Sequence, residues 1–287
     1  MTEVSSTDDA PTEAVPILTS AGGLPAVLSA LTAAVATVAL AVGTAWDTGP
    51  YAAVVLALQL ALVATWCFVA RPPAVWTVVV VAVVTAAGAD AVASWASPAA
   101  VGPLGLVVAG SFGLTIFAQL ARGIARRNVT EAFGVSMLLA VAVTSLATTI
   151  SLHRQDGIPL LLAVMLAAGI GVTAAHVTDL FVPQPVVHEV VARGVPGLVV
   201  GGVTGGVVAA LVAALSDPLS VPLAAVVGLV VGTTAVLSDL GVAYAAAGRA
   251  LATGERRPHL LTCVLGPLFA LPVAAPVGYV FGLVLLN

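Results

Sequence analysis

The stretch from Val221 to Arg249, VPLAAVVGLVVGTTAVLSDLGVAYAAAGR, decides the fold. It is apolar over more than the roughly 20 residues that a helix needs to cross a bilayer, and its single acid is Asp239. At a rise of about 1.5 Å per residue, Asp239 would lie about two turns before Arg249 and close to one membrane face. A carboxylate is costly in lipid, so it either belongs to a site or reaches the interface as an end residue. Both interpretations stay open on the sequence alone.

The composition of the whole chain indicates a membrane protein. Of its 287 residues, 60% are hydrophobic and 8% are charged, whereas soluble domains are about 25% charged. All nine basic residues are arginine, so mechanisms that require lysine, such as a Schiff base, are excluded. The net charge of −4 argues against a nucleic-acid partner. Cys67 and Cys263 are too few for a disulfide framework or a zinc site.

Nine hydrophobic segments are long enough to span a bilayer. A polar, acidic tail over residues 1–20 precedes them, and its composition is typical of disorder. The sequence therefore predicts an all-α polytopic membrane protein with about nine transmembrane helices. Residues 21–121 would form an N-terminal four-helix region and residues 122–287 a C-terminal five-helix region. The spans are expected at about residues 24–46, 51–70, 74–95, 99–120, 129–152, 158–181, 197–215, 221–247 and 260–286.

The arginines predict the orientation, because cytoplasmic loops retain positive charge. Only Arg154 follows an odd-numbered span, and Asp90 is grouped with the solvated acids at that opposite, outer end. We therefore expect the amino terminus inside the cell and the carboxyl terminus outside. The expected location is the bacterial cytoplasmic (inner) membrane. The bias toward Ala, Val, Gly and Arg is typical of a GC-rich bacterial genome and carries no information about mechanism. The arginines after even-numbered spans are Arg71, Arg122, Arg126, Arg127, Arg193, Arg249, Arg256 and Arg257.

This topology collects the polar residues of the C-terminal half at the cytoplasmic end. His176 and Asp179 end the sixth span, Arg193 lies in the loop that follows, and Asp239 approaches the end of the eighth span. His176 and Asp179 are three residues apart, a spacing that places both on one helix face and suits metal ligands. The alternative is a polar helix end that reaches water. Asp179 and Asp239 are the candidate metal ligands.

Glycine and proline distinguish two further spans. The sequence GGVTGG at residues 201–206 contains overlapping pairs of small residues four apart, which favour close helix packing; a ligand-binding turn is the alternative. In the ninth span, Pro267, Pro272 and Pro276 predict kinks or a break. Broken helices occur at transporter sites, but a transporter built from paired repeats should contain a second such segment. We find no convincing second segment in the other half.

The order of these features resembles a known family. The similar region covers residues 122–249, and it resembles the bacterial CDP-diacylglycerol synthases, also called phosphatidate cytidylyltransferases. The resemblance implies a cytoplasmic-side site where CTP and phosphatidate react with the help of a divalent metal and release pyrophosphate. The segments that carry it are RRNVTEAF at 126–133, TAAHVTDLF at 173–181, VPGLVVGGVTGG at 195–206 and LSDLGVAYAAAGR at 237–249.

Most polar positions of the family's pattern are replaced in this chain. Pro196 and the later glycines match, and Asp239 matches the acid of the family's G-D-L element. Val172 stands where the family has an acid, and the loop after Arg249 is too short for the family's downstream K-D and P-G-H-G-G elements. One acid cannot hold a two-metal site. The family's Lys, Thr, Trp and Glu positions hold Leu198, Val199, Val200 and Gly201.

We therefore expect a non-catalytic membrane protein that binds anionic phospholipid or a membrane partner as a regulator or scaffold. The partner would be another membrane protein or a second copy of the chain, and no cofactor is expected. Arginine recognises phosphate bidentately, so the phosphate-binding candidates are Arg193, Arg249, Arg256 and Arg257. One alternative is an active, divergent phosphatidate cytidylyltransferase with Mg²⁺ and with Asp239 as catalytic residue. The other alternative is a transporter or permease subunit.

Overall fold

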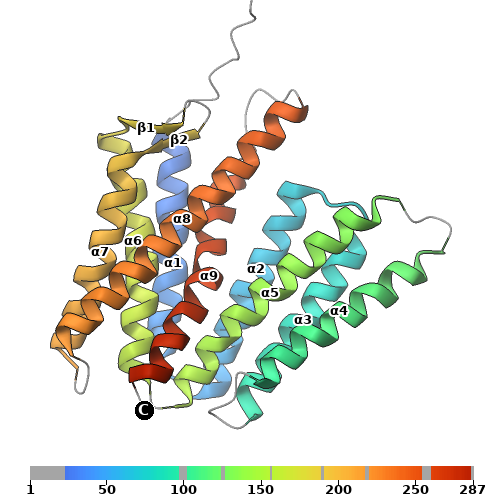
Figure 1. Ribbon diagram of the computed structural model, residues 1–287, viewed down its shortest axis with the longest axis horizontal. Coiled ribbons are helices and arrows are strands. Elements are labelled where there is room, and N and C mark those ends of the chain that lie inside the picture. The colour runs from blue at the N-terminus through green and yellow to red at the C-terminus, as the bar shows by residue number, and fades with distance from the viewer. Residues whose placement is uncertain are drawn as a thin grey trace, which may run out of the picture.

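The computed structural model describes residues 23–96, 102–123, 127–155, 157–188, 191–216, 220–253 and 260–285. Within these ranges it contains nine helices long and apolar enough to cross a membrane (Figure 1). The protein is therefore an all-α polytopic membrane protein, as predicted, while the predicted tail lies outside the described residues. The helices are α1 Gly23–Gly43, α2 Thr48–Ala70, α3 Val75–Trp95, α4 Gly102–Ala121, α5 Val129–His153, α6 Ile158–Phe181, α7 Val195–Ala214, α8 Val221–Thr253 and α9 Thr262–Leu285.

Two connections differ from the sequence-based expectation. The segment between α6 and α7 forms a short antiparallel hairpin, with β1 at Val186–His188 and β2 at Val191–Gly194. Helix α8 continues to Thr253, beyond the expected end at residue 247. Hydropathy alone missed the hairpin because it records neither strand pairing nor the path of a polar connection.

Of the two outcomes expected for the ninth span, kinks or a break, the break is wrong, because α9 is one helix that contains Pro267, Pro272 and Pro276. A proline inside a helix leaves the carbonyl four residues earlier without its usual donor. For Pro267 that carbonyl belongs to Cys263, and the Ser29 hydroxyl of α1 donates a hydrogen bond to it at 2.8 Å. Neighbouring side chains that satisfy such carbonyls allow proline within membrane helices.

Successive helices run in opposite directions, so the ends of α2, α4, α6 and α8 lie at the same end of the molecule (Figure 1). We call this the arginine end, because the described arginines that follow even-numbered spans all lie there, as predicted. Which end faces the cytoplasm stays a prediction. These arginines are Arg71, Arg122, Arg127, Arg193 and Arg249, whereas Arg126, Arg256 and Arg257 lie outside the described residues.

Arg154, the exception in the charge distribution, caps a helix at the opposite end. Its Nη1 atom donates hydrogen bonds to the carbonyls of Ala93 at 2.9 Å and Ala96 at 2.7 Å. These carbonyls lie at the carboxyl end of α3, where no intrahelical donor is available. These two hydrogen bonds give Arg154 a structural role. They explain why one arginine lies at the end of the molecule opposite the arginine end.

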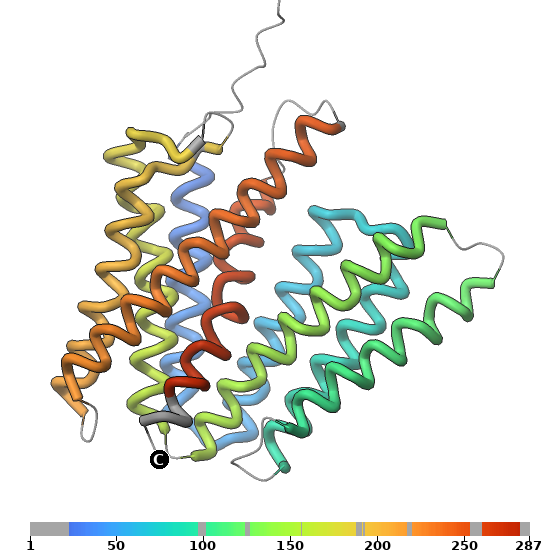
Figure 2. Tube along the Cα trace, in the orientation of Figure 1, coloured from blue at the N-terminus to red at the C-terminus, as the bar shows by residue number. Residues whose placement is uncertain are grey.

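The helices form two groups in space (Figures 1 and 2). Helix α1 packs against α6 and α9, so it belongs with α6–α9, and α5 packs against α3 and α4, so it belongs with α2–α4. Contacts of α2 and α5 with α9 join the groups. The division predicted at residue 121 follows chain order, whereas packing exchanges α1 and α5 between the two halves.

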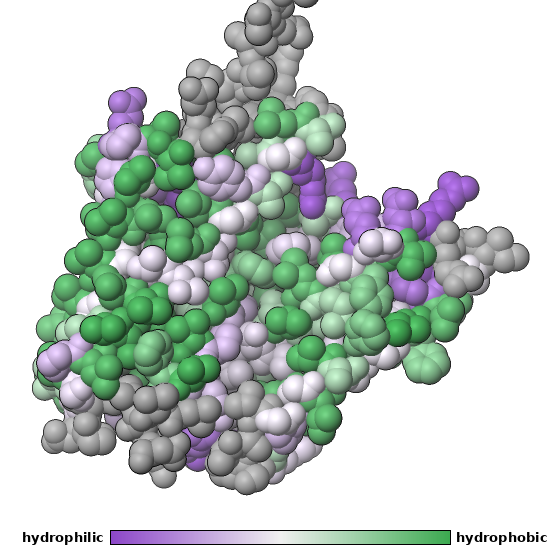
Figure 3. Space-filling model, in the orientation of Figure 1, coloured by the Kyte–Doolittle hydropathy of each residue, from purple (hydrophilic) through white to green (hydrophobic). Residues whose placement is uncertain are grey.

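The exterior is apolar and the helix interfaces are rich in small residues. Figure 3 shows hydrophobic residues over most of the visible face, with hydrophilic residues gathered toward the two ends. In a bilayer, helices associate through close packing rather than through exclusion of water. A methyl group at Gly201 would lie 2.7 Å from the Gly171 carbonyl of α6, and one at Gly205 would lie 2.7 Å from the Gly228 carbonyl of α8. The packing role of the GGVTGG sequence is confirmed.

Candidate functional site

Four polar side chains meet at the arginine end, between α6, α8 and the hairpin. We call this cluster the polar centre. Its members were singled out by the sequence, and the structure brings all of them together. All four are buried, with exposed fractions of 6% for His176, 7% for Asp179, 7% for Arg193 and 4% for Asp239.

The guanidinium of Arg193 bridges the two carboxylates. Its Nε atom lies 3.2 Å from Oδ2 of Asp179 on α6, and its Nη2 atom lies 2.9 Å from Oδ2 of Asp239 on α8. Its Nη1 atom faces the His176 ring and lies closest to Nδ1. Arginine suits this position because its donors form a rigid planar fork that can contact several acceptors at once. One side chain of β2 therefore ties α6 to α8.

His176 completes the link between α6 and α8. Its Nε2 atom lies 3.0 Å from Oδ2 of Asp239. Because an ionised carboxylate only accepts hydrogen bonds, Nε2 is assigned as the donor to Asp239. Nδ1 then accepts a hydrogen bond from Nη1 of Arg193. This assignment follows from the balance of donors and acceptors, since hydrogens themselves are not observed.

Asp179 also anchors the start of α7. Its Oδ1 atom accepts a hydrogen bond from the backbone N–H of Gly194 at 3.1 Å, and Gly194 is the N-cap residue of α7. The first N–H groups of a helix have no intrahelical acceptor and carry partial positive charge. The Asp179 carboxylate therefore meets positive charge from both the helix end and Arg193.

Two glycines give the carboxylates their space. A Cβ atom at Gly197 of α7 would collide with Oδ1 of Asp179, and one at Gly266 of α9 would collide with Oδ1 of Asp239. The backbones of α7 and α9 thus approach the polar centre more closely than any residue with a side chain allows. The centre is enclosed by α6, α7, α8, α9 and the hairpin.

The arrangement bears directly on metal binding. Asp179 and Asp239, the predicted metal ligands, share the Arg193 guanidinium as their cation. In the part of the chain that the structure describes, no group of three or more His, Cys, Asp or Glu side chains is placed to hold a metal ion. The burial of Asp239, together with its pairing, favours a polar site over an end residue that reaches the interface.

The predicted phosphate ligands do not form one surface in the structure. Arg193 is buried in the polar centre, so a lipid phosphate would have to displace two carboxylates to reach it. Arg249 is exposed at the arginine end, where its Nη1 atom donates a hydrogen bond of 3.3 Å to the Val69 carbonyl of α2. Arg256 and Arg257 lie outside the described residues.

A second buried polar pair was not identified from the sequence. The Gln59 side chain of α2 donates through Nε2 to Oδ1 of Asp90 on α3 at 2.8 Å. Asp90 was expected to be a solvated acid, but it is only 6% exposed. Its position five residues before the end of α3 at Trp95, and a glutamine within an otherwise apolar α2, were the available signals.

The helices establish the class of protein, a multi-pass membrane protein. Comparisons of the chain with protein-family models, with curated proteins and with solved structures found no match. The relation to the CDP-diacylglycerol synthases stays a prediction that rests on the segments quoted above.

Proposed function

We propose that this protein is a non-catalytic relative of the CDP-diacylglycerol synthases that binds anionic phospholipid at its arginine end and acts there as a regulator or scaffold. We place it in the bacterial inner membrane with the arginine end toward the cytoplasm. The observation that carries the proposal is the position of Arg193, whose guanidinium bridges Asp179 and Asp239.

The chemistry of nucleotidyl transfer explains why this position matters. The reaction brings a phosphate against a triphosphate, and enzymes offset that repulsion with metal ions and with cationic groups positioned in advance. A metal needs carboxylate oxygens that are not already paired. Here both carboxylates that could serve are paired with Arg193, and the matching resemblance segments lack the family's lysine.

The polar centre has a structural role that needs no turnover. It connects α6, α8 and the start of α7 through ion pairs and the hydrogen bond from Gly194. Removing one partner of a buried ion pair typically costs about 3–5 kcal/mol, because an uncompensated charge remains. A protein that retains such a centre can hold a fixed shape at its arginine end for a lipid or a partner.

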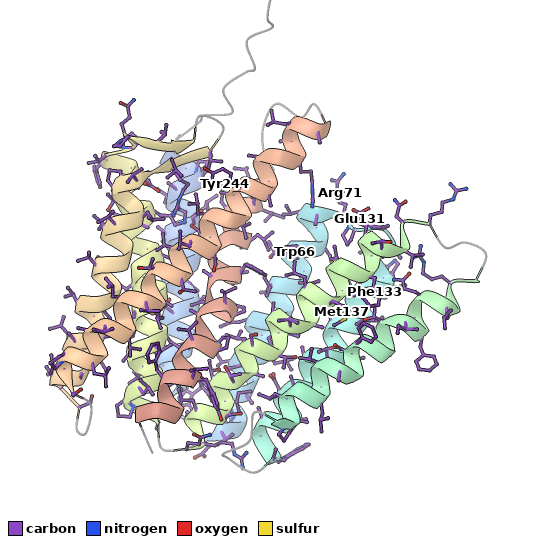
Figure 4. All side chains as sticks on the ribbon, viewed as in Figure 1. Trp66, Arg71, Glu131, Phe133, Met137 and Tyr244 are labelled. Atoms are coloured by element: carbon purple, nitrogen blue, oxygen red, sulfur yellow. The ribbon has the colours of Figure 1, made fainter. Side chains whose placement is uncertain are left out.

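Exposed arginines at that end supply the proposed lipid contacts. Arg71, Arg127 and Arg249 are exposed, and Figure 4 shows Arg71 at the end of α2 and Glu131 at the start of α5, both at the arginine end. A basic residue near an anionic membrane surface contributes about 1 kcal/mol of binding. Several arginines at one end therefore favour anionic over zwitterionic headgroups.

The test is the lipid composition that copurifies with the protein from vesicles of phosphatidylglycerol and phosphatidylcholine, measured by native mass spectrometry. We expect enrichment of phosphatidylglycerol, and replacement of Arg71, Arg127 and Arg249 by glutamine should weaken it about fivefold per residue. The matched control replaces the same residues by lysine, which keeps the charge. Equal enrichment in the wild-type and glutamine proteins would contradict the proposal.

The transporter alternative loses the feature on which it depended. It rested on a broken ninth helix, and α9 is continuous. We therefore do not propose it.

A further inference from the structure

The Gln59–Asp90 pair lies in the α2–α5 group, away from the polar centre, and it is deeply buried. Gln59 is 0% exposed and Asp90 is 6% exposed. Gln59 lies midway between the ends of α2 at Thr48 and Ala70, and Asp90 lies five residues before the end of α3 at Trp95, so the pair lies within the spans and not at a helix end. Acids at such a depth are costly, and by default they indicate function.

The hydrogen bonds around the pair leave two oxygens without partners. Both hydrogens of the Gln59 amide are used, since Nε2 donates to Oδ1 of Asp90 at 2.8 Å and to the Val143 carbonyl of α5 at 2.9 Å. Oε1 of Gln59 and Oδ2 of Asp90 are buried and have no hydrogen-bond partner. If Asp90 is ionised, both of these oxygens are acceptors, so they cannot form a hydrogen bond with each other.

The charged groups on the helices packed against α3 are engaged elsewhere. Arg154 donates to the carbonyls at the end of α3. His153 contacts the Thr44 carbonyl through Nε2 and stacks on Tyr51. Arg71, Arg122 and Glu131 lie where α2, α4 and α5 meet the arginine end, whereas Asp90 lies nearer the other end of the bundle. Within the described residues, Asp90 has no cationic partner to offset a negative charge.

One proton on Oδ2 of Asp90 would remove the uncompensated negative charge and would give both unpartnered oxygens a hydrogen bond. It removes the charge, whose transfer from water into the interior is costly even after the surroundings relax. It also turns Oδ2 into a donor that can bond to Oε1 of Gln59. The carboxylic acid and the amide would then form a cyclic pair, in which Nε2–H donates to Oδ1 and Oδ2–H donates to Oε1.

We propose that Asp90 and Gln59 form a proton-binding site inside the membrane, in which Asp90 carries the proton at neutral pH and the Gln59 amide holds the carboxylic acid. A metal cation fits the pair less well, because the Gln59 Nε2 group, a donor, already lies against Oδ1 of Asp90. Protonatable carboxyl groups within spans are typical of proton relays. The inference is independent of the proposed lipid binding, since it rests on a different group of helices.

The experiment is infrared spectroscopy of the reconstituted protein at neutral pH, comparing wild type with Asp90→Asn. The wild-type spectrum should contain the C=O stretch of a buried carboxylic acid, and this band should be lost in Asp90→Asn. The matched control is Asp47→Asn, which changes an exposed acid at the start of α2 and should leave the band in place. A wild-type spectrum without the band would overturn the proposal.

A stability measurement separates the proton from a bound metal ion. Asparagine has the shape of the protonated acid and can form the same two hydrogen bonds, so Asp90→Asn should keep the thermal midpoint of wild type, while Asp90→Ala should lower it. Exchange of choline chloride for sodium chloride should leave the wild-type midpoint unchanged. A midpoint that rises with sodium in wild type but not in Asp90→Asn would show a sodium site and overturn the proposal.

Discussion

Arg193 is the residue on which the polar centre depends. Its guanidinium contacts Asp179, Asp239 and His176, and its exposed fraction is 7%. An arginine at the surface of a membrane protein contributes mainly to orientation and lipid attraction. Buried between two carboxylates, the same side chain instead supplies the positive charge that makes their burial tolerable.

We predict that Arg193→Gln destabilises the protein by about 3–5 kcal/mol, because it leaves two buried carboxylates without a cation. Unfolding in detergent micelles, followed by tryptophan fluorescence, measures the effect. The matched control is Arg127→Gln at an exposed position, which should change stability by less than about 0.5 kcal/mol. A similar small effect for both variants would show that Arg193 does not hold the centre together.

Residue-level reasoning from the sequence could identify only part of this centre. His176, Asp179 and Asp239 were found because polar groups are conspicuous within apolar spans. The pairing of Arg193 was not predicted, because the charge rule treats any arginine in a loop as a surface anchor. Its burial depends on how the hairpin Val186–Gly194 folds over the end of α6, and hydropathy carries no information on that fold.

At the scale of elements, small residues and proline shape the helix interfaces. Gly201 and Gly205 let α7 approach the backbones of α6 and α8, and the spacing of these glycines made that packing predictable. The continuity of α9 was not predictable, because it depends on a donor from another helix. Ser29 of α1 supplies a hydrogen bond to the Cys263 carbonyl that Pro267 leaves without a donor.

We predict that Ser29→Ala destabilises the protein by roughly 0.6 kcal/mol, the average for hydrogen bonds between membrane helices. In a Pro267→Ala background the loss should approach zero, because the N–H of an alanine at position 267 can bond to the Cys263 carbonyl within the helix. A double-mutant cycle of unfolding free energies measures the difference. Equal effects of Ser29→Ala in both backgrounds would contradict this account of the proline.

At the scale of the whole molecule, the described residues form nine spans in two packed groups, and each group holds a different buried polar site. The polar centre lies at the arginine end among α6–α9, and the Gln59–Asp90 pair lies within the α2–α5 group. The number of spans and the arginine asymmetry followed from the sequence, because both depend on hydropathy and charge along the chain. The grouping of α1 with α6 and α9 did not, since it depends on contacts between segments far apart in sequence.

The most direct test of the central claim, that the polar centre is an ion-paired structural site without turnover, is incorporation of labelled CTP into lipid. Purified wild-type protein in liposomes with phosphatidate and Mg²⁺ should form no CDP-diacylglycerol, while its unfolding transition shows that it is folded. Formation of CDP-diacylglycerol by wild type, and its loss in Asp239→Ala, would contradict the claim and establish an active cytidylyltransferase.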